Sequence, residues 1–464
     1  MQGTFVALDI ETTGLDKERD AIIEIGAVKF QVDFSKRRGR GTAFKEESWT
    51  SLVDPGRPIP YHVRLLTGIT QEEVEGAPSI EEAGRQLLCF MGDATIVGHN
   101  VAFDIGFLRR ALGLEGRAFG LHSVDTFELA GILMPHVTGY SLDILANALG
   151  IDFTTRHRAL PDALIAKEVF LAMFKKAEQL APGIIREINR LAAKSDWALQ
   201  GFFREVERLQ AHSAFEGTLA QRVLGRVDLE GELPGLLFSR KREERPLRPR
   251  LERPKKLDEE SLKEMLSESG LLAQSFPGYE YRPQQVEMLQ AVISTFSDGG
   301  QLLVEAGAGT GKSIAYLLPA IYFAKENMCP VVVSTNTINL QDQLYGKDLP
   351  GLREILPVEF EYTLLKGRTN YLCRRRFQLL RRGGAMTVET IRALAKILVW
   401  LEGTATGDKA ELNLRGEESI WERMCAEEEN CLGERCPYKQ REGCFLYRAR
   451  KRAESAHIIV VNQV

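Results

Sequence analysis

Two carboxylates separated by a single residue near the N-terminus are the first candidates for chemistry in this 464-residue chain. Asp9 and Glu11 lie in a segment typical of a buried strand, and residues two apart on a strand point to the same side. Neighbouring carboxylates repel each other unless divalent cations neutralise them. The pair therefore favours the binding of hard metal ions over a role in fold stability.

Two further acids and one histidine follow where loops enter predicted helices. Asp104 opens a helix that we expect to run to about Leu112, and Asp162 follows His157 by five residues near another helix start. Taken singly, each acid has the alternative role of a helix N-cap or solvated acid, and His157 that of a solvent-facing loop residue. The ordered set of four acids and one histidine favours a catalytic site.

The elements that must position these residues indicate an α/β domain. Thr4 to Ile10, Ile22 to Phe30 and Ala94 to Val97 read as strands. Ser79 with Glu82 forms a capping-box pattern that opens an apolar-periodic helix. Alternating strands and helices predict a sheet with covering helices.

Three motifs resemble those of the DEDDh exonuclease family, and the resemblance spans roughly residues 4–180. They are Asp-Ile-Glu-Thr-Thr-Gly at 9–14, His-Asn-Val-Ala-Phe-Asp at 99–104 and His-Arg-Ala-Leu-Pro-Asp-Ala at 157–163. Val-Asp-Thr at 124–126 and Thr-Gly-Ile-Thr at 67–70 are also similar to this family, with positional roles expected and Asp125 interpreted as structural.

This resemblance implies an RNase H-like domain that hydrolyses phosphodiester bonds from the 3′ end. Asp9, Glu11, Asp104 and Asp162 would hold two Mg²⁺ or Mn²⁺ ions, and His157 would take the proton from the attacking water. Two cations about 3.5 to 4 Å apart relieve charge on the phosphorus and on the departing 3′ oxygen. The expected partner is DNA, as single strands or 3′ ends, with RNA as the alternative, and the expected processes are DNA repair and replication.

A glycine-rich segment after the strand-like residues 301–305 indicates a phosphate-binding loop. Its small residues let backbone N–H groups surround phosphates, while Lys312 can meet the β and γ phosphates and Ser313 can ligate Mg²⁺. ATP with Mg²⁺ is the expected ligand, and a chance glycine-rich turn is the alternative. The expected ATP-binding residues are Arg282, Gln285, Ala306, Gly307, Ala308, Gly309, Thr310, Gly311, Lys312 and Ser313.

The surroundings of this loop resemble the DinG and XPD branch of superfamily 2 helicases. The residues concerned are Arg-Pro-Gln-Gln at 282–285, Ser-Thr-Asn-Thr-Ile-Asn-Leu-Gln-Asp-Gln-Leu at 334–344 and Lys-Gly-Arg-Thr-Asn-Tyr-Leu-Cys at 366–373. The resemblance implies a RecA-like ATPase whose first segment contacts adenine and whose second contacts the DNA backbone. The sequence ends before the Asp-Glu-Ala-His box of that branch. We therefore expect a partial motor, from either a natural truncation or a fragment of a full ATP-dependent helicase and exonuclease.

Four of the seven cysteines occupy positions similar to the [4Fe-4S] ligands of that helicase branch: Cys373, Cys431, Cys436 and Cys444. Four thiolates could equally hold zinc, and spacing alone does not choose the metal. Position within this ATPase favours the iron-sulfur cluster. Cys425 is an additional thiol with no assigned role. Nearby arginines and aromatic residues, among them Tyr371 and Phe445, suit single-strand binding, with a charged surface over core aromatics as the alternative.

Composition and charge divide the chain and set its class. With 44% hydrophobic and 27% charged residues the chain is typical of a globular protein. No apolar run reaches the roughly 20 residues that span a bilayer, and the N-terminus does not resemble a secretory signal. The expected location is therefore the cytoplasm.

The expected domains are an exonuclease at 1–175, a helical connector at 176–238, a linker at 239–257 and a partial ATPase at 258–464 with the cluster insertion at about 366–450. The linker carries nine basic and three acidic residues between Arg240 and Lys256, typical of an extended tether or a phosphate-attracting segment.

Three functions compete at this point. The first is an exonuclease fused to an incomplete ATPase that brings or senses single-stranded DNA. The second is a single-strand-binding module in which cleavage is incidental and the cysteines are structural. The third is a full ATP-driven helicase, of which this chain would be a part. Because a long tether joins the modules, loss of the cluster is expected to leave cleavage of short substrates nearly unchanged.

Overall fold

The structure is a computed structural model that describes residues 2–33, 42–114, 119–120, 123–153, 157–216, 246–249, 254–276, 278–307 and 309–462. Residues 217–238 of the expected connector, most of the expected linker and Ala308 lie outside these ranges. The chain divides into two compact units. Unit 1 comprises residues 1–237, 379–404 and 410–421, and unit 2 comprises residues 238–378, 405–409 and 422–464.

Unit 1 is built around a five-stranded mixed sheet of order β3-β2-β1-β4-β5, in which β2 runs antiparallel to both neighbours and β4 runs parallel to β1 and β5. Its strands are β1 (Gln2–Thr12), β2 (Ile22–Asp33), β3 (Thr42–Leu52), β4 (Thr95–Gly98) and β5 (Val124–Asp125). The three strands expected from the sequence are confirmed, with β1 and β2 longer than predicted, and β3 and β5 are additional.

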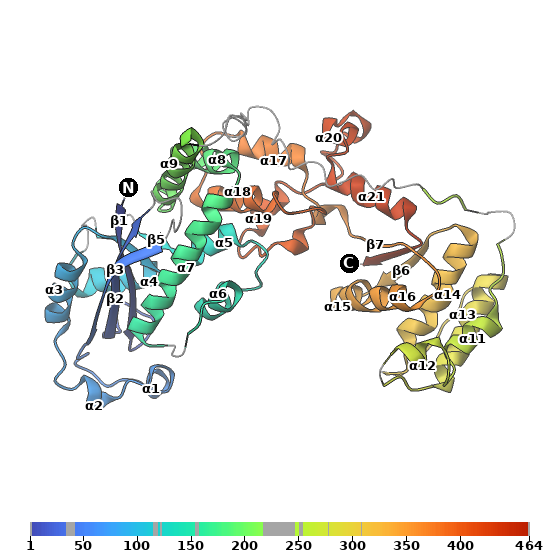
Figure 1. Ribbon diagram of the computed structural model, residues 1–464, viewed down its shortest axis with the longest axis horizontal. Coiled ribbons are helices and arrows are strands. Elements are labelled where there is room, and N and C mark those ends of the chain that lie inside the picture. The colour runs from blue at the N-terminus through green and yellow to red at the C-terminus, as the bar shows by residue number, and fades with distance from the viewer. Residues whose placement is uncertain are drawn as a thin grey trace. The chain divides into compact units, whose positions relative to one another are not determined.

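Helices lie on both faces of this sheet (Figure 1). The apolar side chains of the sheet are buried against them. The helices of unit 1 before the connector are α1 (Tyr61–Thr67), α2 (Gln71–Val74), α3 (Ile80–Met91), α4 (Ala102–Ala111), α5 (Thr126–Leu133), α6 (Leu142–Leu149) and α7 (Ala159–Gln179). Ser79 caps α3 by accepting the N–H of Glu82, as its sequence predicts. Val6, Leu8 and Ile10 pack on the α3 and α4 side, whereas Phe5 packs against Phe170 of α7 at 5.0 Å between ring centroids.

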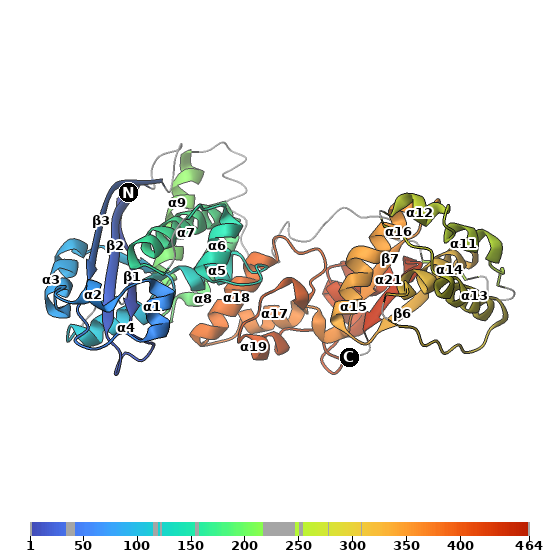
Figure 2. The same cartoon turned by 90° about the horizontal axis from the view of Figure 1, so that it is seen from below.

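Four further helices complete unit 1, and two of them come from far along the chain (Figure 2). They are α8 (Pro182–Ala192), α9 (Gln200–Glu216), α18 (Val388–Trp400) and α19 (Glu418–Glu422). The described part of the expected connector is therefore helical. Helices α18 and α19 belong, by sequence, to the expected cluster insertion, yet they pack with the exonuclease-like part of the chain.

Unit 2 contains a three-stranded parallel sheet of order β6-β8-β7. Its strands are β6 (Val331–Thr335), β7 (Tyr362–Leu365) and β8 (Ile458–Asn462). Its helices are α11 (Glu259–Met265), α12 (Leu271–Ser275), α13 (Pro283–Asp298), α14 (Lys312–Asn327), α15 (Ile338–Gln343), the π-helix η1 (Leu344–Asp348), α16 (Leu349–Ile355), α20 (Pro437–Gln440) and α21 (Phe445–Ser455). The residues of α17 (Arg374–Arg381) are divided between the two units. Short 3₁₀ turns are η2 (Arg368–Asn370), η3 (Lys409–Glu411) and η4 (Gly433–Arg435).

The strand predicted just before the glycine-rich loop is not formed. Residues 301–305 have no strand pairing in the described chain, and Leu303 is 99% exposed. A strand needs a neighbour for its backbone hydrogen bonds, and β6, β8 and β7 pair among themselves. The apolar pattern of a segment does not report whether a pairing partner is available, so the sequence prediction was wrong here.

None of the helices that the structure describes has both the length and the apolar content needed to cross a membrane.

Candidate functional site

The C-terminal end of β1 carries Asp9 and Glu11 on the face of the sheet that α7 covers. Side chains alternate along a strand, so these two residues share the side of Phe5, which packs against α7. Both side chains are half-buried. The sequence-based expectation that the two carboxylates point to the same side agrees with their convergence in the structure.

Asp162 joins this pair from the first turn of α7. One carboxylate oxygen from each of Asp9, Glu11 and Asp162 lies within 4.8 Å of the other two. Asp162 is 6% exposed. Three acidic groups this close would repel one another, and hard oxygen ligands at such a spacing suit Mg²⁺ or Mn²⁺. The donor set therefore fits the divalent cations that the sequence led us to expect.

Asp104 lies beside this group, in the first turn of α4, and is 3% exposed. Its Oδ1 accepts the backbone N–H of Ile10 at 3.0 Å, and Ile10 stands between the two acids of β1. Burial raises the pKa of Asp104 well above its usual range, and the nearby carboxylates of Asp125 and Glu11 raise it further. A cation bound between these groups would remove that repulsion and favour the ionised form.

His157 is placed by its backbone immediately before α7. Its N–H donates to Oδ2 of Asp162 at 3.3 Å, and its φ of 60° is in the left-handed region, which few residues other than glycine adopt. The half-buried imidazole therefore belongs to the same short segment that supplies Asp162.

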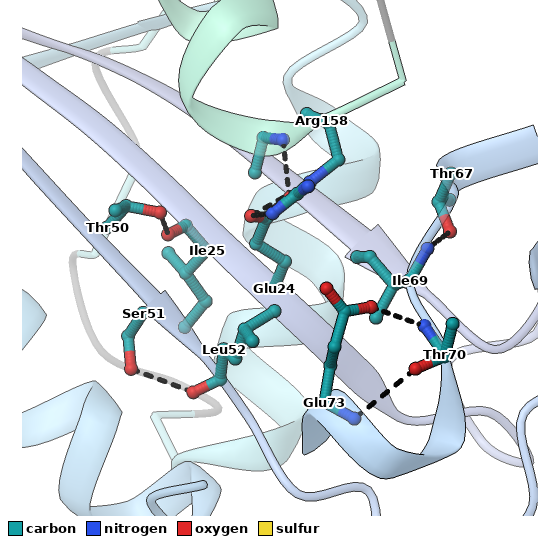
Figure 3. Close-up of polar contacts among 11 residues, drawn as sticks. Glu24, Ile25, Thr50, Ser51, Leu52, Thr67, Ile69, Thr70, Glu73 and Arg158 are labelled. Atoms are coloured by element: carbon teal, nitrogen blue, oxygen red, sulfur yellow. Dashed lines mark hydrogen bonds and ion pairs between the residues drawn. The ribbon is translucent and has the colours of Figure 1, made fainter.

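Sequence reasoning missed an ion pair between buried Glu24 and half-buried Arg158, which holds the start of α7 against the sheet (Figure 3). Glu24 of β2 stands directly opposite Glu11 in the register and is 4% exposed. Arg158 donates to it from Nε and from Nη2, the latter at 2.7 Å, and the N–H of Ala159 donates at 2.9 Å. The hydrogen bonds with Glu24 raise the pKa of Arg158. Together the three donors satisfy a carboxylate that would otherwise be costly to bury.

Gly26 allows the backbone of α7 to approach β2 at this point. It stands opposite Asp9, and a Cβ built on it would lie 2.2 Å from the carbonyl carbon of Ala159. A glycine inside a strand pattern signals such a close approach, so this position was open to prediction from the sequence.

The two motifs expected to be positional have structural contacts. Asp125 caps α5 and accepts the N–H groups of Phe127 and Asn100, each at 2.9 Å. The hydroxyl of Thr67 accepts the N–H of Ile69, and Thr70 forms a capping box with Glu73 at the start of α2 (Figure 3). These contacts support the structural interpretation of Asp125.

The glycine-rich loop of unit 2 enters α14 as the sequence predicts. Lys312 donates from Nζ to the carbonyls of Ala306 and Gly307 at 2.8 and 2.7 Å, and Thr310 donates to Gly307 at 3.0 Å. Gly311 has a φ of 76°, and a Cβ there would meet the side chain of Gln285, which donates to the Gly311 carbonyl at 2.9 Å.

Two other expected ATP-site residues adjoin this loop. Arg282 donates to the Gly309 carbonyl, so both residues expected to contact adenine bond the loop itself. Ser313 lies in the first turn of α14.

At the end of the linker, Lys255 and Lys256 pair with Glu326 and Asp298, which anchors this part of the linker to α14 and α13.

The four candidate cysteine ligands line one cavity of about 110 Å³ in unit 2. Cys373 precedes α17, Cys431 precedes η4, and Cys436 and Cys444 are the N-caps of α20 and α21. Burial raises the pKa of the Cys444 thiol, and the nearby Cys373, Cys436 and Cys431 raise it further. The sequence therefore identified four residues that the fold brings together.

Cys425 and two of the aromatic residues considered for base stacking are buried near the cavity. Cys425 does not line it: its backbone bridges Leu372, its Sγ contacts the Glu422 carbonyl and its side chain is 3% exposed. Tyr371 and Phe445 are 3% and 4% exposed. Both aromatic side chains are core residues, so of the two interpretations that the sequence left open, core aromatics apply to Tyr371 and Phe445. Aromatic content alone does not distinguish a core from a binding surface.

Comparison with known families assigns the N-terminal part of the chain to a class. Residues 6–170 match the family described as Exonuclease (RNase_T). This range contains the four acids, the histidine and the five-stranded sheet. Residues 6–170 thus form an exonuclease domain, and its mixed sheet is that of the expected RNase H-like exonuclease fold.

Two curated relatives extend the similarity along nearly the whole chain. The chain is 30% identical over 465 residues to "3′-5′ exonuclease DinG" of Bacillus subtilis (strain 168), covering 99% of this chain and 46% of the relative. It is 27% identical over 423 residues to the protein of the same name from Staphylococcus aureus (strain USA300), covering 90% of this chain and 43% of the relative. The chain is homologous to DinG-type exonucleases and spans about half the length of these curated relatives.

Solved structures similar to the chain include two nucleases. Exonuclease X in complex with 5′ overhanging duplex DNA is 26% identical, with 38% of this chain and 95% of that chain covered and a TM-score of 0.29. The nuclease domain of 3′hExo, a DEDDh family member, bound to rAMP, is 20% identical, with 37% of this chain and 92% of that chain covered and a TM-score of 0.32.

Proposed function

We propose that the exonuclease domain removes nucleotides from the 3′ end of DNA by two-metal hydrolysis of phosphodiester bonds. The observation that carries this proposal is the convergence of Asp9, Glu11 and Asp162 within 4.8 Å, with Asp104 bonded to the strand between the first two. These four carboxylates would hold Mg²⁺ or Mn²⁺. When bound, two such ions would offset the charge that develops on the phosphate and on the leaving 3′ oxygen.

Side chains of the domain itself would accept the proton and hold the metal ligands in place. His157 would accept the proton of the attacking water, a role that suits an imidazole near neutral pH. Its backbone bond to Asp162 would keep it next to the carboxylates. Glu24 and Arg158 would hold the start of α7, and with it Asp162, against the sheet.

A single-strand-binding module with incidental cleavage is the main alternative. The two functions are separated by incubating 5′-labelled single-stranded DNA with the purified chain in Mn²⁺ or in EDTA. A ladder that shortens from the 3′ end with Mn²⁺ and disappears with EDTA is expected. DNA binding without metal-dependent shortening would overturn the proposed function. Parallel RNA and DNA substrates decide which nucleic acid is preferred.

We further propose that unit 2 binds ATP with Mg²⁺ as part of a helicase-type ATPase. The contacts of Lys312 and Gln285 with the glycine-rich loop and the start of α14 at Lys312 support this proposal. Such an ATPase would bring or sense single-stranded DNA for the nuclease.

Replacing Lys312 by alanine should weaken ATP binding by about 10- to 100-fold, because a charge-assisted hydrogen bond contributes about 1.5 to 3 kcal/mol. Titration with a fluorescent ATP analogue measures the change. Lys347→Ala, which removes an exposed lysine from η1, is the matched control and should bind as the unaltered chain does. Equal affinities for the Lys312→Ala and Lys347→Ala proteins would contradict the assignment.

We also propose that the cysteine cavity holds a [4Fe-4S] cluster and not a single zinc ion. A tetrahedral zinc site with Zn–S bonds of about 2.3 Å brings its sulfurs to about 3.8 Å from one another. Among the described residues, which include all four cysteines, no three of these thiols lie within 4.8 Å of one another. The wider spacing and the cavity of about 110 Å³ favour a polynuclear cluster.

Protein purified without oxygen should be brown, and Cys436→Ser should lose the colour, because a serine oxygen replaces a soft thiolate poorly. Visible absorption and iron and zinc analysis measure the outcome. Cys425→Ala is the matched control, since Cys425 lies outside the cavity, and it should keep both colour and iron. Zinc without iron in the unaltered protein, or a coloured Cys436→Ser protein, would reject the proposal.

A further inference from the structure

A helical segment between Cys373 and Cys431 in the sequence forms part of the exonuclease unit. Helix α18 of this segment packs against α5 and α8 (Figure 2). Nine of its residues from Ile391 to Trp400 are buried, including Lys396 among apolar neighbours. Because every residue from Ala393 to Trp400 is buried, the second half of α18 is an internal element of a domain and not a surface attachment.

Arg392 of α18 makes a two-pronged polar contact with the exonuclease domain. Its guanidinium donates from Nε and Nη2 to the two carboxylate oxygens of Glu128 in the first turn of α5, and the Nη2 contact measures 2.9 Å. Glu128 also accepts the indole N–H of Trp197 at 2.5 Å, and Trp197 is 3% exposed. The Glu128 side chain is 15% exposed. A carboxylate this removed from water depends on its two donors.

A second set of contacts holds the loop that follows α5. The backbone N–H of Asn413 donates to the carbonyl of Pro135 at 2.8 Å, and its side-chain amide donates to the carbonyl of Val137 at 2.9 Å. Buried Lys396 donates to the Asn413 carbonyl at 3.0 Å and pairs with Glu417. Helix α5 is therefore held by this segment at its first turn and just beyond its end.

The N-terminus of α5 in turn holds the loop that leads to Asp104. Asp125 caps α5 and accepts the N–H of Asn100, whose φ of 59° is in the left-handed region. The Thr126 hydroxyl donates to the Gly98 carbonyl and lies within 3.0 Å of His99 Nδ1. Three contacts thus join the first residues of α5 to residues 98–100, and Asp104 follows in the first turn of α4.

We infer that Arg392 is a positioning residue for the exonuclease site, acting through Glu128 and α5 on the 98–104 segment. The inference rests on the proposed exonuclease function. The guanidinium anchors Glu128 and so fixes the orientation of α5 about its axis and its position along that axis. The N-cap of α5 in turn fixes Asn100, which precedes Asp104 in the chain. A residue from the region of the predicted cysteine cluster would thereby set the activity of the nuclease site.

The test compares Arg392→Ala, Arg392→Lys and the control Arg382→Ala in the full chain, with a short single-stranded DNA and Mn²⁺. Arg382 is an exposed arginine of the same segment. We expect Arg392→Ala to lower kcat by about 2- to 30-fold with little change in KM, as for other couplings transmitted through packed elements. Lysine keeps the charge without the two-pronged geometry, so the kcat of Arg392→Lys should lie between that of Arg392→Ala and that of the unaltered protein.

Hydrogen exchange gives a readout that is independent of turnover. In Arg392→Ala, peptides that contain the amides of Asn100 and Phe127 should exchange faster, while peptides from β1 and β2 keep their protection. Glu128→Gln should produce the same change, and the double variant should add little to either single variant. If unaltered protein cleaves DNA and Arg392→Ala matches Arg382→Ala in both kcat and exchange, the inference is wrong. Inactivity of the unaltered protein would instead refute the proposed function.

Discussion

Replacing Asp9 by asparagine is expected to reduce metal-dependent shortening of DNA by more than about 100-fold. The amide keeps the shape of the side chain but removes the negative charge from a group of three carboxylates within 4.8 Å. Removing a residue that only hydrogen-bonds to a metal ligand already lowers metal affinity or activity by about 10- to 100-fold. Removing a ligand itself should therefore have a larger effect. Release of labelled nucleotides in Mn²⁺ measures the effect.

The control for this experiment is Asp93→Asn, which neutralises an exposed acid of the same domain. It should cleave DNA at the rate of the unaltered protein. In EDTA the Asp9→Asn protein should be at least as thermally stable as the unaltered protein, because the substitution relieves repulsion and removes no core packing. Substantial metal-dependent cleavage by Asp9→Asn would show that the carboxylate group is not the catalytic centre.

Gly26→Ala is expected to disable the same site without touching any of its carboxylates. The new methyl group would lie 2.2 Å from both the Ala159 carbonyl carbon and the Leu160 nitrogen, which are backbone atoms and cannot rotate away. The start of α7 must therefore shift, carrying His157 and Asp162 with it. A displacement of about 1 Å can cost about 100-fold in rate, and overpacking costs about 1 to 3 kcal/mol in stability.

Gly201→Ala provides the matched control, because a Cβ at Gly201 in α9 meets nothing within 4 Å. Alanine is the better helix former, so this variant should be as stable as the unaltered protein or slightly more stable. Thermal unfolding and Mn²⁺-dependent cleavage are measured for both variants. If the Gly26→Ala protein were as active as the Gly201→Ala protein, the close approach of β2 and α7 would have no role in positioning the site.

The local features of the site could be predicted from the sequence because they depend on short-range geometry. Alternation along a strand places Asp9 and Glu11 together, and loop-to-helix transitions place Asp104 and Asp162 in first helical turns. The glycine-rich loop was assigned by the same kind of local pattern. The four cysteines were grouped by their resemblance to a known ligand set, and the cavity of unit 2 brings them together.

Tertiary structure alone decided which distant elements pack together. Residues 301–305 have the apolar pattern of a strand but no pairing partner in the described chain, and Tyr371 and Phe445 became core residues although their sequence context suited base stacking. The pairing of Glu24 with Arg158 joins residues far apart in the chain, as does that of Glu128 with Arg392. Pairing and burial depend on what lies opposite each element in space, and a one-dimensional pattern carries no such information. For that reason the sequence suggested two modules joined by a tether, whereas the fold packs α18 and α19 into the exonuclease unit.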